Sequence, residues 1–204
     1  MKHVVVTRCK FKDDDSFNKY LPSIKKYYIP SINSQTDKNF KIALIINPSH
    51  YQIMRDCVDK QIEILPFNDT KKDYRDYVMN NNITIQTRHD CDDYMSPNYI
   101  KKIHELYESN KSKYDDFILN FHPYKHDSKT GKDYYHSRDY SKVCSMFSTL
   151  IQKKVNVGVF DQVHDLLRRI TSNVIYIPAS GDVKLVIHDS NSLSKIMNGE
   201  ILVK

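Results

Sequence analysis

Short apolar runs alternate with amphipathic stretches along the first 121 residues of the chain. Runs rich in β-branched and aliphatic residues have the length of buried strands at 3–8, 41–47, 61–67, 83–88 and 116–121. The stretches between them carry apolar residues at helical spacing, at 17–28, 49–58, 71–79 and 97–109. Strands that alternate with helices of about ten residues predict a mostly parallel sheet covered on both faces, and therefore an α/β fold.

The alternation breaks beyond residue 121. The segment 122–140 is polar and aromatic, and Gly131 is expected at the tip of a hairpin. The later elements expected are a helix over 157–169 and strands at 173–177 and 183–187. The sequence shows no internal repeat and no linker, so we expect a single domain over 1–204 with a more irregular second half.

The composition is that of a globular protein, with 204 residues, 40% of them apolar and 27% charged. The longest aliphatic run, 42–46, has five residues, so we expect no membrane span, which needs about 20. The first residues lack the long apolar core of a secretory signal. Four widely spaced cysteines, without a CxxC pair, are typical of reduced thiols. These features predict a cytoplasmic protein.

The net charge of +6 favours an anionic partner, but positive and negative residues are mixed along the chain. Because no basic stripe with interleaved aromatic residues is present, we expect no nucleic-acid partner. A small ligand that carries phosphate fits this balance better than a polymer does. The absence of a GxGxxG motif and of a P-loop motif makes dinucleotide oxidoreductases and P-loop enzymes poor candidates.

The clearest candidate for chemistry is an acidic cluster that follows the fourth expected strand, Arg88-His89-Asp90-Cys91-Asp92-Asp93. In an open parallel sheet, ligands bind outside the carboxyl ends of the strands, which is where this cluster would lie. Crowded carboxylates suit Mg²⁺ or Mn²⁺, which also hold substrate phosphates, and Arg88 can bind phosphate directly. Alternatively, these carboxylates are loop residues that cap the following helix and face water.

The cluster resembles the DxD region of GT-A glycosyltransferases, in which R-x-D-x-D-D and then S-P-x-Y-I follow the fourth strand. The matching residues are Arg88, Asp90, Asp92, Asp93, Ser96, Pro97, Tyr99 and Ile100. The segment 29–40 is similar to the P-S-(I/L)-x-x-Q-T-x-x-x-F segment of such enzymes, and 186–191 to their V-H-x-x-N segment. The likeness is strongest to the rhamnosyltransferase-like group. Small proteins of this type also occur in large double-stranded DNA viruses, so the expected location would then be the host cytoplasm.

The resemblance implies a GT-A fold with a nucleotide-binding half, 1–121, and an acceptor-side half, 122–204. It implies a nucleotide-diphosphate sugar as the donor, with a UDP-sugar favoured, and Mn²⁺ or Mg²⁺ as the cofactor. The implied metal ligands are Asp92, His188 and Asp90, of which Asp90 could instead contact the ribose. The metal would stabilise the charge on the leaving nucleotide diphosphate. His188 could equally be a core or surface histidine at a strand end.

The same likeness implies a set of donor-binding residues, Thr7, Arg8, Asn68, Asp69, Arg88, Asp90, Cys91 and Asp92. For Asp69, the N-cap of the following helix is at least as good an interpretation.

The implied reaction is transfer to a hydroxyl of a glycan or glycoprotein acceptor, with inversion at the anomeric carbon. Such a transfer needs a general base that takes the proton of the hydroxyl. Asp161, in the first turn of the expected late helix, is the candidate base and His164 the reserve, although a carboxylate there also suits the helix dipole. Retention would remove the need for this base. The aromatic segment 122–136 could contact a sugar or be a plain hairpin.

Two other functions remain open from the sequence. A metal-dependent phosphodiesterase or nuclease could use Asp90, Asp92 and Asp93, although two-metal hydrolysis usually draws carboxylates from several strands. A non-catalytic module that binds a nucleotide sugar is the second alternative.

Overall fold

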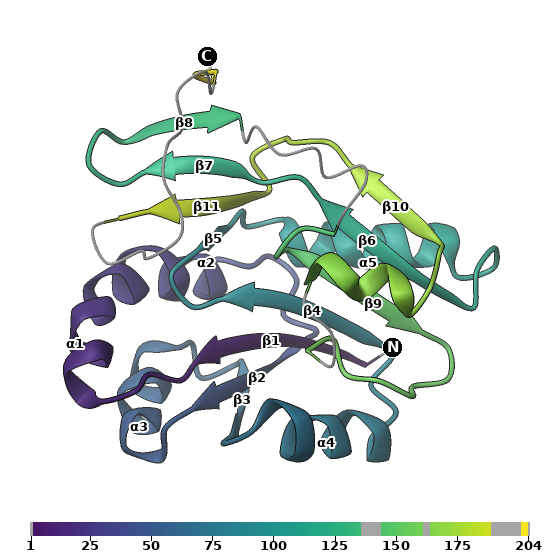
Figure 1. The fold of residues 1–204 in the computed structure, drawn as a ribbon, viewed down its shortest axis with the longest axis horizontal. Helices are drawn as coiled ribbons and strands as arrows, with labels where there is room; N and C mark the ends of the chain where they lie inside the picture. The colour runs from purple at the N-terminus through teal and green to yellow at the C-terminus, as the bar shows by residue number, and fades with distance from the viewer. Residues whose placement is uncertain (1, 136–143, 161–163, 189–200, 204) are drawn as a thin grey trace.

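The computed structural model describes residues 2–135, 144–160, 164–188 and 201–203. Within these residues the chain forms a larger central sheet, in the strand order β10-β6-β9-β4-β1-β2-β3, and a second sheet in the order β5-β11-β7-β8 (Figure 1). All neighbouring strands of the central sheet are parallel except where β9 pairs. This arrangement confirms the predicted α/β fold with a mostly parallel central sheet flanked by helices.

The strands of the central sheet are β1 (His3–Cys9), β2 (Lys41–Ile46), β3 (Glu63–Phe67), β4 (Ile85–Asp90), β6 (Asp116–Phe121), β9 (Ser148–Gln152) and β10 (Val174–Ile177). Those of the second sheet are β5 (Tyr94–Met95), β7 (Tyr124–Asp127), β8 (Lys132–Tyr135) and β11 (Val183–Ile187). The α-helices are α1 (Asp14–Ser23), α2 (Ile29–Asn33), α3 (Pro48–Cys57), α4 (Arg75–Asn80) and α5 (Tyr99–Asn110). Shorter helical turns are the π-helical η1 (Ile24–Tyr28) and η2 (Thr70–Tyr74) and the 3₁₀-helical η3 (His164–Arg169). Among the described helices, none combines the length and the apolar character needed to cross a bilayer.

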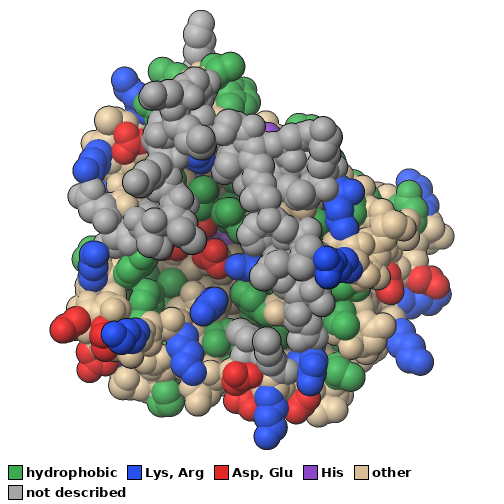
Figure 2. All heavy atoms as spheres, viewed as in Figure 1, with side chains coloured by type: hydrophobic (Ala, Val, Ile, Leu, Met, Phe, Trp, Pro, Cys, Tyr) green, Lys and Arg blue, Asp and Glu red, His purple; other side chains and the backbone are tan. Residues whose placement is uncertain are grey.

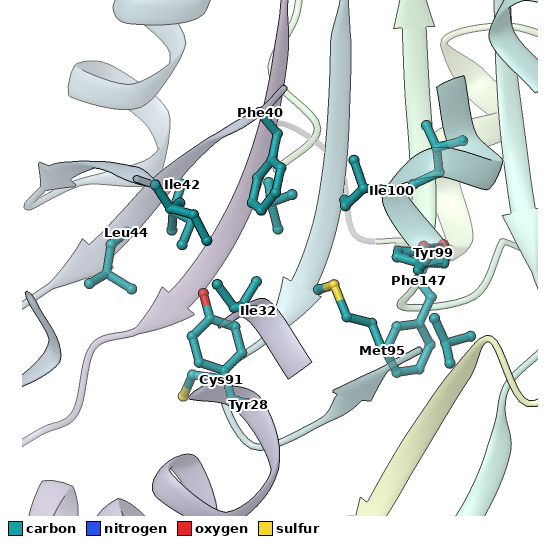
Figure 3. Close-up of a cluster of buried hydrophobic side chains, with 14 of the residues drawn as sticks. Tyr28, Ile32, Phe40, Ile42, Leu44, Cys91, Met95, Tyr99, Ile100 and Phe147 are labelled. Atoms are coloured by element: carbon teal, nitrogen blue, oxygen red, sulfur yellow. Dashed lines mark hydrogen bonds between the residues drawn. The ribbon is translucent and has the colours of Figure 1, made fainter. Parts of the chain in front are cut away.

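Two apolar clusters lie on opposite faces of the central sheet, because alternate side chains of a strand point to opposite faces. On β1, Val5 packs into one cluster, whereas Val4 and Val6 pack into the other. The first cluster includes side chains from α1, α2, α3 and α5, among them Ile32 and Tyr99 (Figure 3). The second cluster includes side chains from η2, α4 and η3. Helices on both faces thus bury the sheet, as the alternating pattern predicts.

The first helical segment is longer than the predicted 17–28. It begins at Asp14, because Asp13 Oδ1 accepts a hydrogen bond from the backbone N–H of Ser16 at 2.8 Å and caps the helix. The segment continues past Pro22 through η1 into α2. A proline removes one bond of the helical ladder, and a π-helical turn is one way in which a helix absorbs such a disturbance.

Strand β9 was not predicted, although it lies between β4 and β6 and is antiparallel to both. All its residues are buried, but three of the five, Ser148, Thr149 and Gln152, are polar. Thr149 shares a hydrogen bond with Thr87 of β4 at 2.8 Å, and Ser148 donates to Asn120 Oδ1 of β6 at 3.2 Å. Polar side chains can be buried when neighbouring strands supply partners, and a search for apolar runs does not find such a strand.

The helix predicted over 157–169 is wrong in its first part, because residues 157–160 form a bend and a turn. Of the described residues in this range, those of η3 are helical. The strands predicted at 173–177 and 183–187 are confirmed as β10 and β11. The expected hairpin is confirmed as β7–β8, with Gly131 between them at φ 71°. Glycine adopts this left-handed backbone at no steric cost.

The second sheet brings the late strand β11 to the acidic cluster. Strand β5 begins at Tyr94, directly after Asp93, and pairs antiparallel with β11 so that Tyr94 lies opposite Lys184. Residues about ninety positions apart in the sequence therefore meet at this turn.

Candidate functional site

A cleft of about 490 Å³ lies at the carboxyl ends of β1 and β4. Its lining residues come from the ends of these strands and from α1, and they are Arg8, Lys10, Phe11, Tyr20, Arg88, Asp90, Cys91 and Asp92. The two strands run side by side and both point towards α1 (Figure 1). On the face shown in Figure 2, acidic and basic side chains lie next to each other near the centre. The cleft occupies the place where open parallel sheets bind ligands.

The register of β1 and β4 decides which of the predicted residues reach the cleft. Thr7 lies opposite His89, and Arg8 lies opposite Asp90. Because side chains alternate between the two faces, Arg8 and Asp90 share one face and Thr7 and His89 share the other. Thr7 is fully buried and its hydroxyl bonds to the hydroxyl of Tyr28 at 2.8 Å. The side chain of Thr7 is therefore in the core, and a contact of the donor with Thr7, through its backbone groups, stays a prediction.

Arg88 is held in a fixed position at one side of the cleft. Its guanidinium carbon lies 4.6 Å from the centre of the Phe160 ring, and one terminal nitrogen lies 3.9 Å from Asp90 Oδ1. A guanidinium over an aromatic face is attracted to the ring electrons. With Arg8 and Lys10, Arg88 gives the cleft three cationic side chains.

The acidic turn and the end of β11 meet at Asp92 and His188. His188 follows β11 directly, and its Nε2 lies 3.0 Å from Asp92 Oδ2. Both side chains are largely buried, 7% exposed for His188 and 16% for Asp92. The ring of Tyr20 packs edge-on against His188 at 5.5 Å, and burial and the charge of Asp92 raise the pKa of Tyr20. The structure thus brings together two of the residues that the sequence assigned to the metal.

The carboxylates of the acidic cluster diverge from one another. Asp90 lies beside Arg88, whereas Asp93 is 1% exposed and accepts a hydrogen bond from the backbone N–H of Val186 at 2.9 Å. Burial, and then the charges of Asp92 and Asp90, raise the pKa of Asp93 well above its usual range. Asp93 therefore ties the turn to β11. In the described part of the chain, no group of three His, Cys, Asp or Glu side chains is arranged to hold a metal ion.

The residues between these carboxylates are buried. Burial lowers the pKa of His89 to about 4, and its Nδ1 lies 2.7 Å from the backbone carbonyl of Asp90, so the neutral ring donates from Nδ1. Cys91 is 4% exposed; a hydrogen bond with the thiol of Cys9, and then burial, raise the pKa of its thiol. Cys91, predicted to bind the donor, therefore borders the cleft as an inert, protonated thiol.

The residues after β3 lie beside the cleft rather than in its lining. Asn68 accepts two hydrogen bonds from Lys10 Nζ, at 2.7 Å to its backbone oxygen and 2.9 Å to Oδ1. Asp69 Oδ1 accepts from the backbone N–H of Lys72 at 2.7 Å. This is the geometry of a helix cap, the alternative that the sequence left open for Asp69. A contact of Asn68 or Asp69 with a nucleotide stays a prediction.

Sequence reasoning missed Lys10, Phe11 and Tyr20. Tyr20 lies at helical spacing within the predicted helix 17–28, where the pattern indicates a core position, and Lys10 and Phe11 belong to no motif. Their only signal was proximity to the end of β1, where a parallel sheet places its ligand. Of the predicted bases, Asp161 lies outside the described residues, and His164 is placed only as the first residue of η3.

The sequence matches no protein-family model and no curated protein. The fold is similar to that of S. aureus TarS, with a TM-score of 0.57 at 9% identity over 92% of this chain and 37% of that chain. A fragment of S. aureus TarS, 1–349, in complex with UDP-GlcNAc has a TM-score of 0.51 at 9% identity, over 96% of this chain and 62% of that one. A cytidylyltransferase from Leptospira borgpetersenii has a TM-score of 0.54 at 10% identity, over 89% of this chain and 76% of that one.

These likenesses identify the fold as GT-A-like, the fold of nucleotide-diphospho-sugar transferases. The resemblance inferred from the acidic cluster is therefore confirmed for the fold. This chain spans less than two thirds of the TarS chains that it matches. The likeness to the rhamnosyltransferase-like group and a viral origin stay predictions.

Proposed function

We propose that this domain binds a nucleotide-diphosphate sugar and transfers the sugar to a hydroxyl of a glycan or glycoprotein acceptor. The observation that carries the proposal is one cleft in which Arg8, Lys10 and Arg88 lie near the pair of Asp92 and His188. Three cations at the carboxyl ends of two parallel strands suit a diphosphate group. The cleft volume of about 490 Å³ is in the range of small-ligand sites.

The donor that fits best is a UDP-sugar. Phe11 and Tyr20 supply aromatic surface in the same cleft as the cations, and such surface can stack on a base or a sugar ring. A fragment of TarS with this fold forms a complex with UDP-GlcNAc, which supports a UDP-sugar here. The transferred group would be a hexosyl or rhamnosyl residue.

The donor atoms of Asp92 and His188 fit Mn²⁺ or Mg²⁺. Asp92 Oδ2 and His188 Nε2 lie 3.0 Å apart, so one ion could contact both. A carboxylate oxygen suits either ion, an imidazole nitrogen suits Mn²⁺ better than Mg²⁺, and either ion keeps water or phosphate oxygens in its other positions. Asp90 borders the same cleft and is proposed to contact the metal or the ribose. When bound, the ion would supply positive charge against the leaving diphosphate. The divergence of Asp90 and Asp93 gives no support to a nuclease that uses all the carboxylates together.

In the proposed reaction the acceptor oxygen attacks the anomeric carbon while the bond from that carbon to the diphosphate breaks. The electron pair of this bond leaves with the nucleotide diphosphate, and the hydroxyl proton passes to a general base. Asp161 and His164 remain the bases proposed from the sequence.

Removal of the Asp92 carboxylate tests the site directly. With Asp92→Ala, we expect loss of the Mn²⁺-dependent rise in melting temperature that UDP causes in the wild-type protein. The control is Asp76→Ala, because Asp76 is an exposed carboxylate on α4. Wild-type protein without a Mn²⁺-dependent shift would count against the proposal, as would Asp92→Ala protein that keeps it.

Two further assays separate the alternative functions. Slow release of UDP from a UDP-sugar supports a transferase, and cutting of DNA or RNA with Mn²⁺ would instead support a phosphodiesterase. A thermal shift without turnover of any of a panel of UDP-, GDP- and dTDP-sugars would favour a binding module.

A further inference from the structure

A cluster of charged side chains lies on the second sheet, outside the lining of the cleft. His126 of β7 and Asp133 of β8 are register partners, and His126 Nδ1 lies 2.7 Å from Asp133 Oδ1. Lys184 of β11 donates from Nζ to Asp133 Oδ2 at 2.6 Å. The side chains of His126, Asp133 and Lys184 are 19%, 23% and 25% exposed, so solvent reaches each of them.

The contact with Asp133 determines which ring nitrogen of His126 carries the hydrogen. An ionised carboxylate only accepts hydrogen bonds, so His126 Nδ1 carries the hydrogen and Nε2 of the neutral ring carries a lone pair. The bonds from Lys184 and His126 lower the pKa of Asp133 despite its partial burial, which keeps this carboxylate ionised. Across the described residues, Nε2 of His126 has no hydrogen-bond partner and is not one of the buried unpaired atoms. The lone pair is thus open to solvent.

The neighbours of His126 orient the ring without occupying Nε2. The ring of Tyr27, from η1, packs edge-on against His126 at 5.6 Å. Lys184 also lies over the ring of Tyr94 at 5.5 Å, which holds it beside Asp133. A further charged neighbour among the described residues is Asp127, on β7 itself.

The cluster lies one strand away from the residues proposed to hold the metal. His126 is the register partner of Val186, and His188 follows Val186 by two positions. The pairing extends to the end of β11, because Ser128 N donates to the carbonyl of Ile187 at 3.0 Å. Two positions along a strand and one strand across correspond to a Cα separation of about 8 Å. His126 and Val186 are register partners and share a face of the sheet. Rings from the segment α1–η1 pack against both histidines, Tyr27 against His126 and Tyr20 against His188.

We propose that His126, oriented by Asp133, is a catalytic residue that takes the proton of the acceptor hydroxyl. The inference rests on the proposed function. The O–H bond of the acceptor breaks and its proton goes to Nε2, while the oxygen bonds to the anomeric carbon and the nucleotide diphosphate leaves with the electron pair. A base separated from the diphosphate site by about the width of a sugar ring suits attack from the side opposite the leaving group. Asp133 stabilises the imidazolium that forms.

The test uses His126→Gln, Asp133→Asn and the control His104→Gln, since His104 of α5 makes the same kind of contact, with Asp37 Oδ2 at 2.7 Å, away from the cleft lining and from this cluster. The full chain is incubated with UDP-GlcNAc, UDP-glucose and Mn²⁺, and the release of UDP to water is measured between pH 5 and 9. Binding of the same donors is followed by thermal shift. Nitrogen-15 NMR of histidine-labelled protein reports which ring nitrogen of His126 is protonated.

We expect His126→Gln to lower UDP release by about 10²-fold or more, with the donor-induced thermal shift unchanged. Asp133→Asn should also lower the rate, and His104→Gln should not. Wild-type rate in a His126→Gln protein that binds the donor overturns the proposal, and Asp161→Asn then becomes the variant of interest. Hydrogen on Nε2 at pH 7.5 overturns it without any assay of activity.

Failure of the proposed function has a different signature. Wild-type protein without a Mn²⁺-dependent donor shift overturns both proposals. Wild-type protein that binds the donor but releases no UDP leaves donor binding intact and overturns both the transfer reaction and its base, which is the outcome that favours a binding module. Wild-type turnover that His126→Gln does not lower overturns the base alone.

Discussion

Gln35 connects the end of α2 to the turn after β5 and to the start of α5. It is 2% exposed. Its Nε2 donates to the backbone carbonyls of Ser31 and Ser96, both at 2.8 Å, and its Oε1 accepts from the backbone N–H of Ile100 at 3.1 Å. The Q-T pair of the segment 29–40 therefore has a structural role, because it fixes the chain that leaves the acidic cluster.

Replacement of Gln35 by alanine should cost about 3 kcal/mol of unfolding free energy. The carbonyls of Ser31 and Ser96 each keep a second hydrogen bond. The N–H of Ile100 lies in the first turn of α5, where no carbonyl of the same helix can pair with it, so it is left buried and unpaired. A lost hydrogen bond costs roughly 1 kcal/mol, and a buried donor without a partner costs about 1–3 kcal/mol.

Urea unfolding at pH 7 measures this loss, and the melting temperature should fall by about 6–12 °C for a chain of this size. The control is Gln61→Ala, since Gln61 is exposed and its side chain makes no hydrogen bond within the described residues. An unfolding free energy within about 1 kcal/mol of the wild type would refute the reasoning, because it would mean that the Ile100 N–H finds another partner.

Two further predictions concern the pH dependence of stability at His3 and the turn at Gly131. Burial, and then the charge of His104, hold the pKa of His3 well below its usual 6.5. Just below pH 6.5, His3 is therefore protonated in the unfolded chain but stays neutral in the folded chain. The stability from His3 is therefore complete above pH 6.5 and is lost as the pH falls below it; urea midpoints at pH 7 and 5 should differ less in His3→Gln than in the wild type. Gly131→Ala should lower the unfolding free energy by about 1–2 kcal/mol through backbone strain alone, because no atom lies within 4 Å of the added Cβ. Equal midpoints of the Ala variant and the wild type would contradict that expectation.

Local patterns predicted the central sheet well where strands are apolar. The strand predicted at 41–47 is one residue longer than β2, and the strand predicted at 116–121 has the same bounds as β6. The hydrophobic pattern did not predict β9, because its polar side chains, such as Thr149, are buried against hydrogen-bond partners on other strands. It also predicted too late a start for α1, because the cap at Asp13 begins the helix earlier. Such partners are far apart in the sequence, so no local period reveals them.

For the candidate site too, some features were predicted from the sequence and others were not. The acidic cluster after β4 and the late His188 were both predicted, and both contribute to the geometry of Asp92 with His188. The sequence did not predict that Asp93 would be buried against Val186. It also gave no reason to connect His126 with Asp133, whose pairing depends on the register of the β7–β8 hairpin.

The amino-acid sequence by itself determined the alternation of strands and helices, the α/β class and the position of the acidic cluster at the end of a strand. Periodicity and residue type act over short distances, so they specify local elements and the edge of the sheet where a ligand binds. Only the tertiary structure decided which side chains meet. The pairing of β5 with β11, the insertion of β9 and the register of β1 against β4 direct each side chain to the core or to the cleft. These choices depend on contacts between distant segments, whose energies appear only when the whole chain is folded.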